Sequence, residues 1–326
     1  MLEKYVKKIR ISKCYISVRE YIIHVNKQIK EKGEFRRALK KYYKEKVNYK
    51  KIHFLRDEEA LDLLKQGKSL CRFGDGEIGW LLERHSYNAF KQENSKLLSS
   101  RLKEVLQCND EDILVGVPNV FDGLDFLEDW AIPFNVKALA EFGKDWMQLL
   151  HEDRMYCDSR MTRLYGDVKD KSNCEMLFRR WKSVFRDNDI VIIEGEYTRF
   201  GVGNDLLNTS KSVRRILAPA ENAFEKYEKI LDVAKEMDKK VLFLIALGPT
   251  ATILAYDLYR KGYQAIDIGH LDIEYEWFLR KMPHQSCIPG KYVGESIQNQ
   301  ENYMLTDKLD KKPFEKYCNS VIMTIR

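Results

Sequence analysis

Short runs of apolar and β-branched residues, bounded by glycine, proline or charged residues, recur along this chain. Such runs are typical of the buried strands of a parallel sheet, and they span residues 69–73, 112–118, 189–195, 214–219, 240–249 and 264–269. Apolar residues at helical spacing lie between most of them, at residues 57–68, 220–238 and 250–262. This alternation predicts right-handed βαβ units, and hence an α/β domain whose mostly parallel sheet is flanked by helices.

The remaining segments do not follow this alternation. Residues 121–151 are rich in Phe and Trp and have helical character, which indicates a lid or an insert that packs beside the core. The tail from about residue 283 is mixed and polar, and we expect it to wrap the core without adding strands. Residues 1–50 are predicted to form a basic, helical N-terminal extension, and residues 51–326 a single domain.

The charge of the chain is unevenly distributed. The formal net charge is +6, but residues 1–51 hold 17 Lys and Arg against 5 Glu, or +12, so the rest of the chain carries 6 minus 12, or −6. A basic extension on a mildly acidic domain predicts contact with something anionic, and a membrane surface or an acidic protein both remain open. No RNA- or DNA-binding motif is present, so we expect no nucleic acid partner.

The cysteines and the hydropathy of the chain indicate the cellular compartment of the protein. Seven cysteines are scattered without a CxxC pair, which indicates neither a disulfide framework nor a zinc site and favours a reducing cytoplasm. No uncharged apolar run approaches the roughly 20 residues of a spanning helix, and no signal-peptide cleavage pattern is found. We expect a cytoplasmic protein, and a peripheral contact with the inner face of the membrane and a homo-oligomer both remain open.

Asp75 and Glu77 flank Gly76 where the predicted strand 69–73 gives way to a helix. In extended backbone, residues two apart project to the same side, so the two carboxylates could form a half-site for Mg²⁺ or Mn²⁺. Arg72 could add a bidentate clamp on phosphate. The alternative is an Asp-Gly turn followed by a helix start, and the triplet alone favours that alternative.

Two further segments carry candidate phosphate and sugar ligands. Arg160 and Arg163 lie three apart, so a helical turn would place both on one face, although an arginine pair bridging to surface acids is the more common reason for such spacing. A loop after strand 189–195 holds Arg199, Asn204 and Asp205 among glycines that allow close approach of a ligand. The GxGxxG fingerprint of NAD-binding proteins is missing there.

The last two motifs follow the last two predicted strands. Gly248-Pro249-Thr250 begins a helix, and a plain strand-to-helix turn would look the same. Beyond residue 269 come His270, Asp272, Glu274 and Glu276, any of which could remove a proton from a hydroxyl. The alternative is an acidic helix start that complements the helix dipole.

Taken together, the motifs RFGDGE, DSRMTR, EGEYTRFGVGNDL, APAENAF, LGPTATILAYDL and GHLDIEYEW resemble those of the GT-D type glycosyltransferases, the family formerly labelled domain of unknown function 1792. The resemblance runs from about residue 55 to 295 and leaves the basic extension outside. It implies a Rossmann-like domain and a metal-dependent transferase that uses a nucleotide sugar, typically UDP-glucose. It also implies that the D-x-E motif, Asp75 and Glu77, holds the ion, and that the acceptor is a glycan of a bacterial surface glycoprotein or polysaccharide.

The resemblance gives the candidate residues their roles. The base in an inverting reaction would be Asp205, Asp272 or Glu274, with Glu274 slightly favoured. The residues expected to bind the UDP-sugar are Arg72, Gly74, Arg160, Arg163, Arg199, Asn204, Asn222, Gly248, Pro249 and Thr250. The alternatives are a non-catalytic subunit that binds a sugar nucleotide or glycan, a metal-dependent phosphoesterase, and a nucleic-acid binder acting through the extension.

Overall fold

A computed structural model describes residues 30–84, 91–283, 286–292 and 311–326 of the chain. These residues form one sheet of nine strands, in the order β1-β4-β3-β2-β8-β7-β5-β6-β9, in which every neighbouring pair is parallel. The strands are β1 (His53–Phe54), β2 (Ser69–Arg72), β3 (Ile113–Val117), β4 (Met155–Asp158), β5 (Asp189–Gly195), β6 (Ser212–Ala218), β7 (Leu242–Ala246), β8 (Gln264–Asp267) and β9 (Val321–Thr324). The α/β fold class predicted from the alternation is confirmed, and the sheet is wholly parallel.

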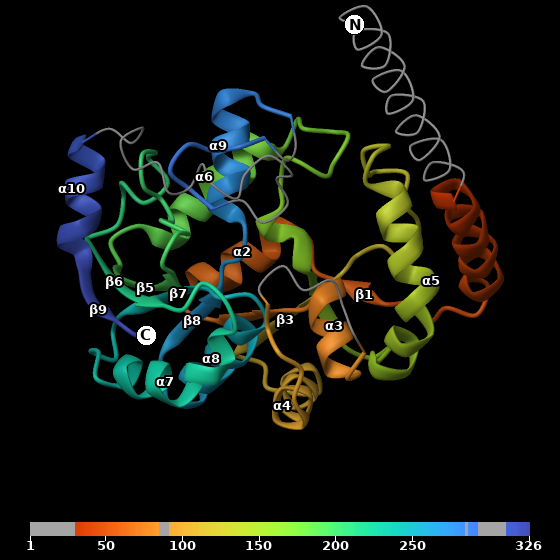
Figure 1. Ribbon diagram of the computed structural model, residues 1–326, viewed down its shortest axis with the longest axis horizontal. Coiled ribbons are helices and arrows are strands. Elements are labelled where there is room, and N and C mark those ends of the chain that lie inside the picture. The colour runs from red at the N-terminus through yellow and green to blue at the C-terminus, as the bar shows by residue number, and fades with distance from the viewer. Residues whose placement is uncertain (1–29, 85–90, 284–285, 293–310) are drawn as a thin grey trace, which may run out of the picture.

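Helices cover both faces of the sheet (Figure 1). One face carries α2 (Asp57–Lys65), α6 (Cys174–Phe185) and α9 (Leu271–Arg280), and the other carries α3 (Asp75–Leu81), α4 (Lys96–Leu106), α7 (Tyr227–Lys235) and α8 (Pro249–Arg260). Alternate residues of a strand therefore pack into different apolar clusters. Ile190 and Ile192 of β5 pack in the cluster with α2, α6 and α9, and Val191 and Ile193 pack in the cluster with α3, α4, α7 and α8. Burial on both faces explains why the strands read as continuous apolar runs.

The sheet has a point at which its connections change direction. β2 is followed by α3 and α4, which lead to β3 on one side, whereas β8 on its other side is followed by α9 on the opposite face. In open parallel sheets a ligand crevice forms outside the carboxyl ends of the strands at such a point. The fold therefore directs attention to the ends of β2 and β8.

The tail was predicted to add no strand, and this is wrong. After α10 (Lys311–Ser320), β9 pairs in parallel with β6 at the edge of the sheet. Its outward residues Ile322 and Met323 stay 42% exposed, so the short run has none of the burial signal of the inner strands. The strands β1 and β4 were also missed, because β1 has only two residues and β4 has only two buried ones, Tyr156 and Cys157, so neither forms an apolar run.

Residues 30–46 of the basic extension are helical and pack beside α5 (Ile132–Leu149), the main element of the predicted 121–151 insert. Tyr42 is buried in the same apolar cluster as α5, and the Lys46 Nζ donates to the Asp122 carbonyl at 2.6 Å. Residues 1–29 of the extension lie outside the described residues. Within the described part, no helix combines the length and the hydrophobicity that crossing a membrane requires.

Candidate functional site

Arg72 and Asp267 join the ends of β2 and β8 where the crevice is expected. The Arg72 Nη2 lies 2.7 Å from the Asp267 Oδ1, and Nε donates to the Asp267 carbonyl at 2.8 Å. A third donor, Nη1, reaches the Ser159 carbonyl beyond β4 at 3.1 Å. Arg72 was predicted as a phosphate clamp, and that role stays a prediction; in this structure its guanidinium ties three parts of the sheet edge together.

Asp75 and Glu77 occupy the first turn of α3, with Gly74 as the N-cap residue. The Gly74 N–H donates to the Glu77 Oε2 at 2.8 Å, so Glu77 caps its own helix. Residues two apart on a helix are separated by about 200° around its axis. The premise that these carboxylates lie on extended backbone and point the same way is therefore wrong, although both remain within one helical turn beside the crevice.

The electrostatics of this turn favour a cation. Removal from solvent raises the pKa of Glu77 to about 7, and the charges of Asp267 and Asp75 add to that increase, while the Gly74 hydrogen bond opposes it. The Asp267 carboxylate is itself bound to Arg72. Among the described residues, no group of three or more His, Cys, Asp or Glu is arranged to hold a metal ion.

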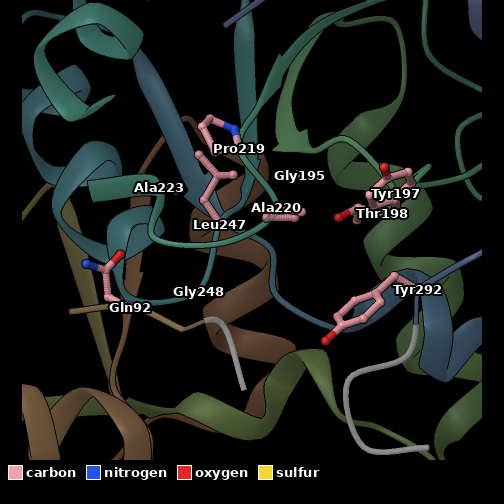
Figure 2. Close-up of a pocket in the computed structure, with 11 residues that line it drawn as sticks. Gln92, Gly195, Tyr197, Thr198, Pro219, Ala220, Ala223, Leu247, Gly248 and Tyr292 are labelled. Carbon is pink, nitrogen blue, oxygen red and sulfur yellow. The ribbon is translucent and has the colours of Figure 1, made fainter. Parts of the chain in front are cut away.

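A pocket lies next along the same edge, at the ends of β5, β6 and β7 (Figure 2). Its walls include Gly195, Tyr197 and Gly248, and Gln92 and Tyr292 lie on opposite sides of it. Gly248 is the N-cap residue of α8, whose first residues are Pro249 and Thr250. A helix N-terminus beside a pocket offers N–H groups and a positive dipole end to phosphate.

Asn222 and Thr250, two predicted ligands of the UDP-sugar, do not themselves line this pocket. The Asn222 Oδ1 accepts from the Gln92 Nε2 at 2.8 Å and from the Glu93 N–H at 3.1 Å, so Asn222 fixes the wall that Gln92 forms. The Thr250 Oγ1 is buried and has no hydrogen-bond partner among the described residues. An unsatisfied buried hydroxyl at a helix N-terminus is suited to a ligand oxygen or to water.

Asp272 belongs to a buried charge network that the sequence did not predict. The Lys291 Nζ lies 2.6 Å from the Asp272 Oδ2 and 3.1 Å from the Glu276 Oε1. The Asn204 Nδ2 donates to the same two carboxylates, at 2.7 and 2.8 Å. Asp272, a candidate base, is thus held by a cation that is itself 1% exposed.

This network places Tyr292 at the pocket. Lys291 precedes Tyr292, whose backbone N–H donates to the Tyr197 carbonyl at 3.1 Å. One residue earlier, the Gly290 carbonyl accepts from the Arg199 Nη1. The predicted ligands Arg199 and Asn204 therefore hold the segment that forms one wall of the pocket.

The other two candidate bases differ in accessibility. Asp205 is exposed, lies 2.7 Å from the Lys182 Nζ and accepts from the Tyr275 hydroxyl at 2.6 Å, and these partners lower its pKa. Glu274 is fully buried, and its Oε2 accepts from the Tyr165 and Gly166 N–H groups at 2.8 and 2.7 Å. Burial raises the pKa of Glu274 to about 7, with Arg163 opposing the shift.

Arg160 lies within a short 3₁₀ turn (Ser159–Thr162) and Arg163 directly follows it, but the two contact different elements. The Arg160 guanidinium stacks over the Phe126 ring at 4.3 Å, and its Nε and Nη1 are buried without a hydrogen-bond partner among the described residues. The Arg163 Nη2 lies 3.1 Å from the His270 Nδ1, at the start of α9. The expectation that one helical face carries both is not met, because Arg163 is the C-cap residue and its backbone, with φ −125° and ψ 65°, has left the helical conformation.

Residues 70–296 match the family described as glycosyltransferase GT-D fold. The chain belongs to the GT-D glycosyltransferase family. It is 35% identical over 254 residues to a probable glycosyl transferase Gly of Streptococcus gordonii, and 36% identical over 252 residues to glycosyltransferase GlyD of Streptococcus pneumoniae serotype 4. Each match covers 77% of this chain but only 37% and 31% of those proteins, so the chain spans about a third of their length.

Solved GT-D structures agree with the fold. A structure of domain of unknown function 1792, described as having a distinct glycosyltransferase fold, has a TM-score of 0.76 and 31% identity, covering 91% of this chain and 100% of that one. Another, described as a new glycosyltransferase from Streptococcus sanguinis, has a TM-score of 0.74 and 32% identity, covering 85% of this chain and 100% of that one.

Several residues of this GT-D site had no separate signal in the sequence. Asp267 lies inside the predicted strand 264–269, Lys291 lies in the polar tail, and Gln92 follows a segment without a motif. Their importance comes from partners far along the chain, which spacing cannot reveal. The strand end at Asp267 was the one usable signal, since carboxyl ends of parallel strands gather at one edge.

Substituting Gly269 is expected to loosen the Arg72–Asp267 contact. A Cβ at Gly269 would lie 2.0 Å from the Arg72 Nη2, and φ there is +48°. Gly262 has φ +82° but nothing within 4 Å of its Cβ position, so it controls for backbone strain alone. We expect G269A to unfold in urea with about 2 kcal/mol less stability than G262A, because a charged hydrogen bond is lost. Equal stabilities would show that Arg72 moves aside without cost.

Glu274 should give the stability a distinctive pH dependence. Its raised pKa means that the native state is stabilised below the unfolded pKa near 4.5, and that this stabilisation is lost as pH rises to about 7. Relative to E274Q, the wild-type protein should therefore lose about 3 kcal/mol of unfolding free energy across that window. Urea denaturation at pH 4.5, 6 and 8 measures the difference.

E276Q serves as the matched control. Burial works to raise the pKa of Glu276, but Lys291 and Asn204 lower it overall, so its contribution is lost as pH falls. The difference in unfolding free energy between the wild type and E276Q should therefore change with pH in the opposite direction. If the difference in unfolding free energy between the wild type and E274Q does not change with pH, the pKa of Glu274 is not raised in the native state.

Proposed function

We propose that this chain is a metal-dependent glycosyltransferase domain that transfers a glucosyl group from UDP-glucose to a hydroxyl of a glycan on a bacterial surface glycoprotein or polysaccharide. The observation that carries the proposal is the position of the GT-D motifs: β2, β7 and β8 bring the D-x-E turn, the α8 N-terminus and the α9 acids to one sheet edge. The relatives described as glycosyltransferases support it.

The geometry supports a division of this edge between phosphate and nucleoside. The N-terminus of α8, at Gly248, Pro249 and Thr250, suits a diphosphate because the first turn of a helix has N–H groups without intrahelical partners and a positive dipole end. The adjacent pocket has Tyr197 and Tyr292 in its walls, and aromatic rings suit a nucleobase. Arg160, with two unpartnered nitrogens, is the arginine best placed to gain hydrogen bonds from a ligand.

We assign Asp75 and Glu77, the D-x-E pair in the first turn of α3, to a divalent ion, Mn²⁺ or Mg²⁺. Burial, and then the charges of Asp267 and Asp75, raise the pKa of Glu77, and a cation would offset the repulsion among these carboxylates. Hard ions of this kind commonly complete their shell with substrate phosphate oxygens and water, which agrees with the absence of a third protein ligand among the described residues. When bound, the ion would offset the charge that grows on the leaving diphosphate.

Glu274 remains our proposed base. Its pKa of about 7 suits proton removal at neutral pH, whereas Asp272 is held by Lys291 and Asp205 by Lys182. The Glu274 Oε1 has no hydrogen-bond partner among the described residues, so it could accept a proton once an acceptor hydroxyl reaches it. Because the side chain is fully buried, the 165–166 backbone would have to open first.

Incubation of the purified protein with a panel of UDP-sugars, a glycan acceptor and Mn²⁺ or Mg²⁺ tests the proposal. We expect UDP release with UDP-glucose that depends on both the acceptor and the metal. Tight UDP-glucose binding without any turnover would instead identify a non-catalytic binding subunit. Release of phosphate from a phosphate ester without a sugar donor would identify a phosphoesterase.

A further inference from the structure

The helix over residues 30–46 has a basic outer face. Five of its cations, Arg36, Arg37, Lys40, Lys41 and Lys44, are exposed. At about 100° per residue they fall within an arc of roughly 140° on one side of the helix. They lie outside the part of the chain that matches the GT-D family, which begins at residue 70.

The orientation of this helix is fixed by its opposite face. Tyr42 is 3% exposed, and Phe35, Ala38 and Leu39 pack against the same apolar cluster. Just beyond the helix, the Tyr49 hydroxyl donates to the Leu139 carbonyl of α5 at 3.3 Å. The basic face therefore points away from the body, at the edge of the molecule opposite α10 and β9 (Figure 1).

A groove between this helix and α5 extends the basic surface. It is lined by Lys40, Lys41, Lys44 and Lys144, with one carboxylate, Glu45. Glu45 is 8% exposed and lies 3.5 Å from the Lys144 Nζ and 4.0 Å from the Lys41 Nζ. One buried carboxylate cannot neutralise four lysines, so the groove keeps a net positive charge.

Two large apolar side chains stand among these cations. Tyr43 is 60% exposed and Val47 is 80% exposed, one helical turn apart on the same side. A purely ionic polyanion would contact only the cations, whereas a bilayer offers anionic head groups to the lysines and a less polar layer beneath to Tyr43 and Val47.

We propose that this face, formed by Arg36, Arg37, Lys40, Lys41, Lys44, Lys144, Tyr43 and Val47, docks the protein on an anionic lipid bilayer. The cations supply attraction to the head groups, and Tyr43 and Val47 insert at the interface. The inference goes beyond sugar transfer and does not depend on it, because none of these residues belongs to the proposed catalytic edge.

Co-sedimentation of the full chain with vesicles tests the proposal. We expect binding to vesicles of phosphatidylglycerol and phosphatidylcholine, none to phosphatidylcholine alone, and weakening as salt rises. The variant K40E/K41E/K44E should lose at least about 100-fold in partitioning, since each basic residue near an anionic surface contributes about fivefold and each new carboxylate is repelled by that surface. The control K311E/K312E/K316E makes the same charge change on exposed positions of α10 and should bind like the wild type.

The variant Y43S/V47S separates a bilayer from a soluble anion. It should weaken vesicle binding about tenfold and leave retention on heparin unchanged. Circular dichroism and turnover of a soluble acceptor should be unaltered in every variant, which distinguishes failed docking from failed folding or failed catalysis. The proposal is overturned if the α10 control loses as much vesicle binding as K40E/K41E/K44E. It is also overturned if Y43S/V47S binds vesicles like the wild type and a soluble acidic polypeptide binds the protein equally well.

Discussion

Replacing Asp75 with alanine should lower metal-stimulated sugar transfer at least about 100-fold while the protein stays folded. Electrostatic groups aimed at developing charge commonly contribute 10²–10³ in rate. Asp75 is exposed at the first position of α3, so its removal creates no cavity. Activity is measured as UDP release over a Mn²⁺ titration, and circular dichroism checks the fold.

Glu77 requires a gentler substitution, because its carboxylate also caps α3. E77Q keeps an oxygen for the Gly74 N–H at 2.8 Å but removes the charge, so it should lose activity without losing the helix start. E228A, an exposed acid in the first turn of α7, is the control and should retain full activity. Wild-type rates with unchanged metal dependence in D75A or E77Q would rule out this half-site.

Replacing Lys291 with methionine should destabilise the protein by about 3–5 kcal/mol, since removing one partner of a buried ion pair leaves uncompensated charge. Asp272 and Glu276 would both remain buried, 2% exposed each, without their cation. Urea denaturation at pH 7 measures the loss. Affinity for UDP should also fall, because Lys291 holds the segment that places Tyr292 at the pocket.

The control K211M removes an exposed pair, Lys211–Asp189 at 2.7 Å, and should cost less than about 1 kcal/mol. Neutralising the partners as well, in K291M/D272N/E276Q, should restore much of the stability, because the buried charge is then gone. If K291M is no less stable than K211M, the network does not stabilise the fold.

The sequence predicted those parts of the fold whose burial is set locally. The inner strands β5 and β7 are covered on both faces, so their continuous apolar runs predicted them as strands. β9 could not be predicted in the same way, because Ile322 and Met323 remain exposed and only pairing with β6 makes them a strand.

The position of the site could be predicted from the sequence, but the contacts between its residues could not. Strand ends directed attention to Arg72 and to Gly248 because parallel strands end at one edge. The sequence could not reveal that Arg72 is bound to Asp267, that Lys291 neutralises Asp272, or that a helix replaces extended backbone at Glu77. The last error followed from treating Asp75, Gly76 and Glu77 as extended backbone, whereas α3 begins at Asp75.

The pairing of β2 with β8 has a consequence for how the chain folds. Arg72 and Asp267 are 195 residues apart, and parallel pairings over such separations form slowly. At 5–20 residues per second, roughly 10 to 40 s of synthesis separate the emergence of these two residues from the ribosome. The crevice that carries the proposed chemistry is thus closed late, and for that interval the apolar edge of β2 is open to strands of other nascent chains.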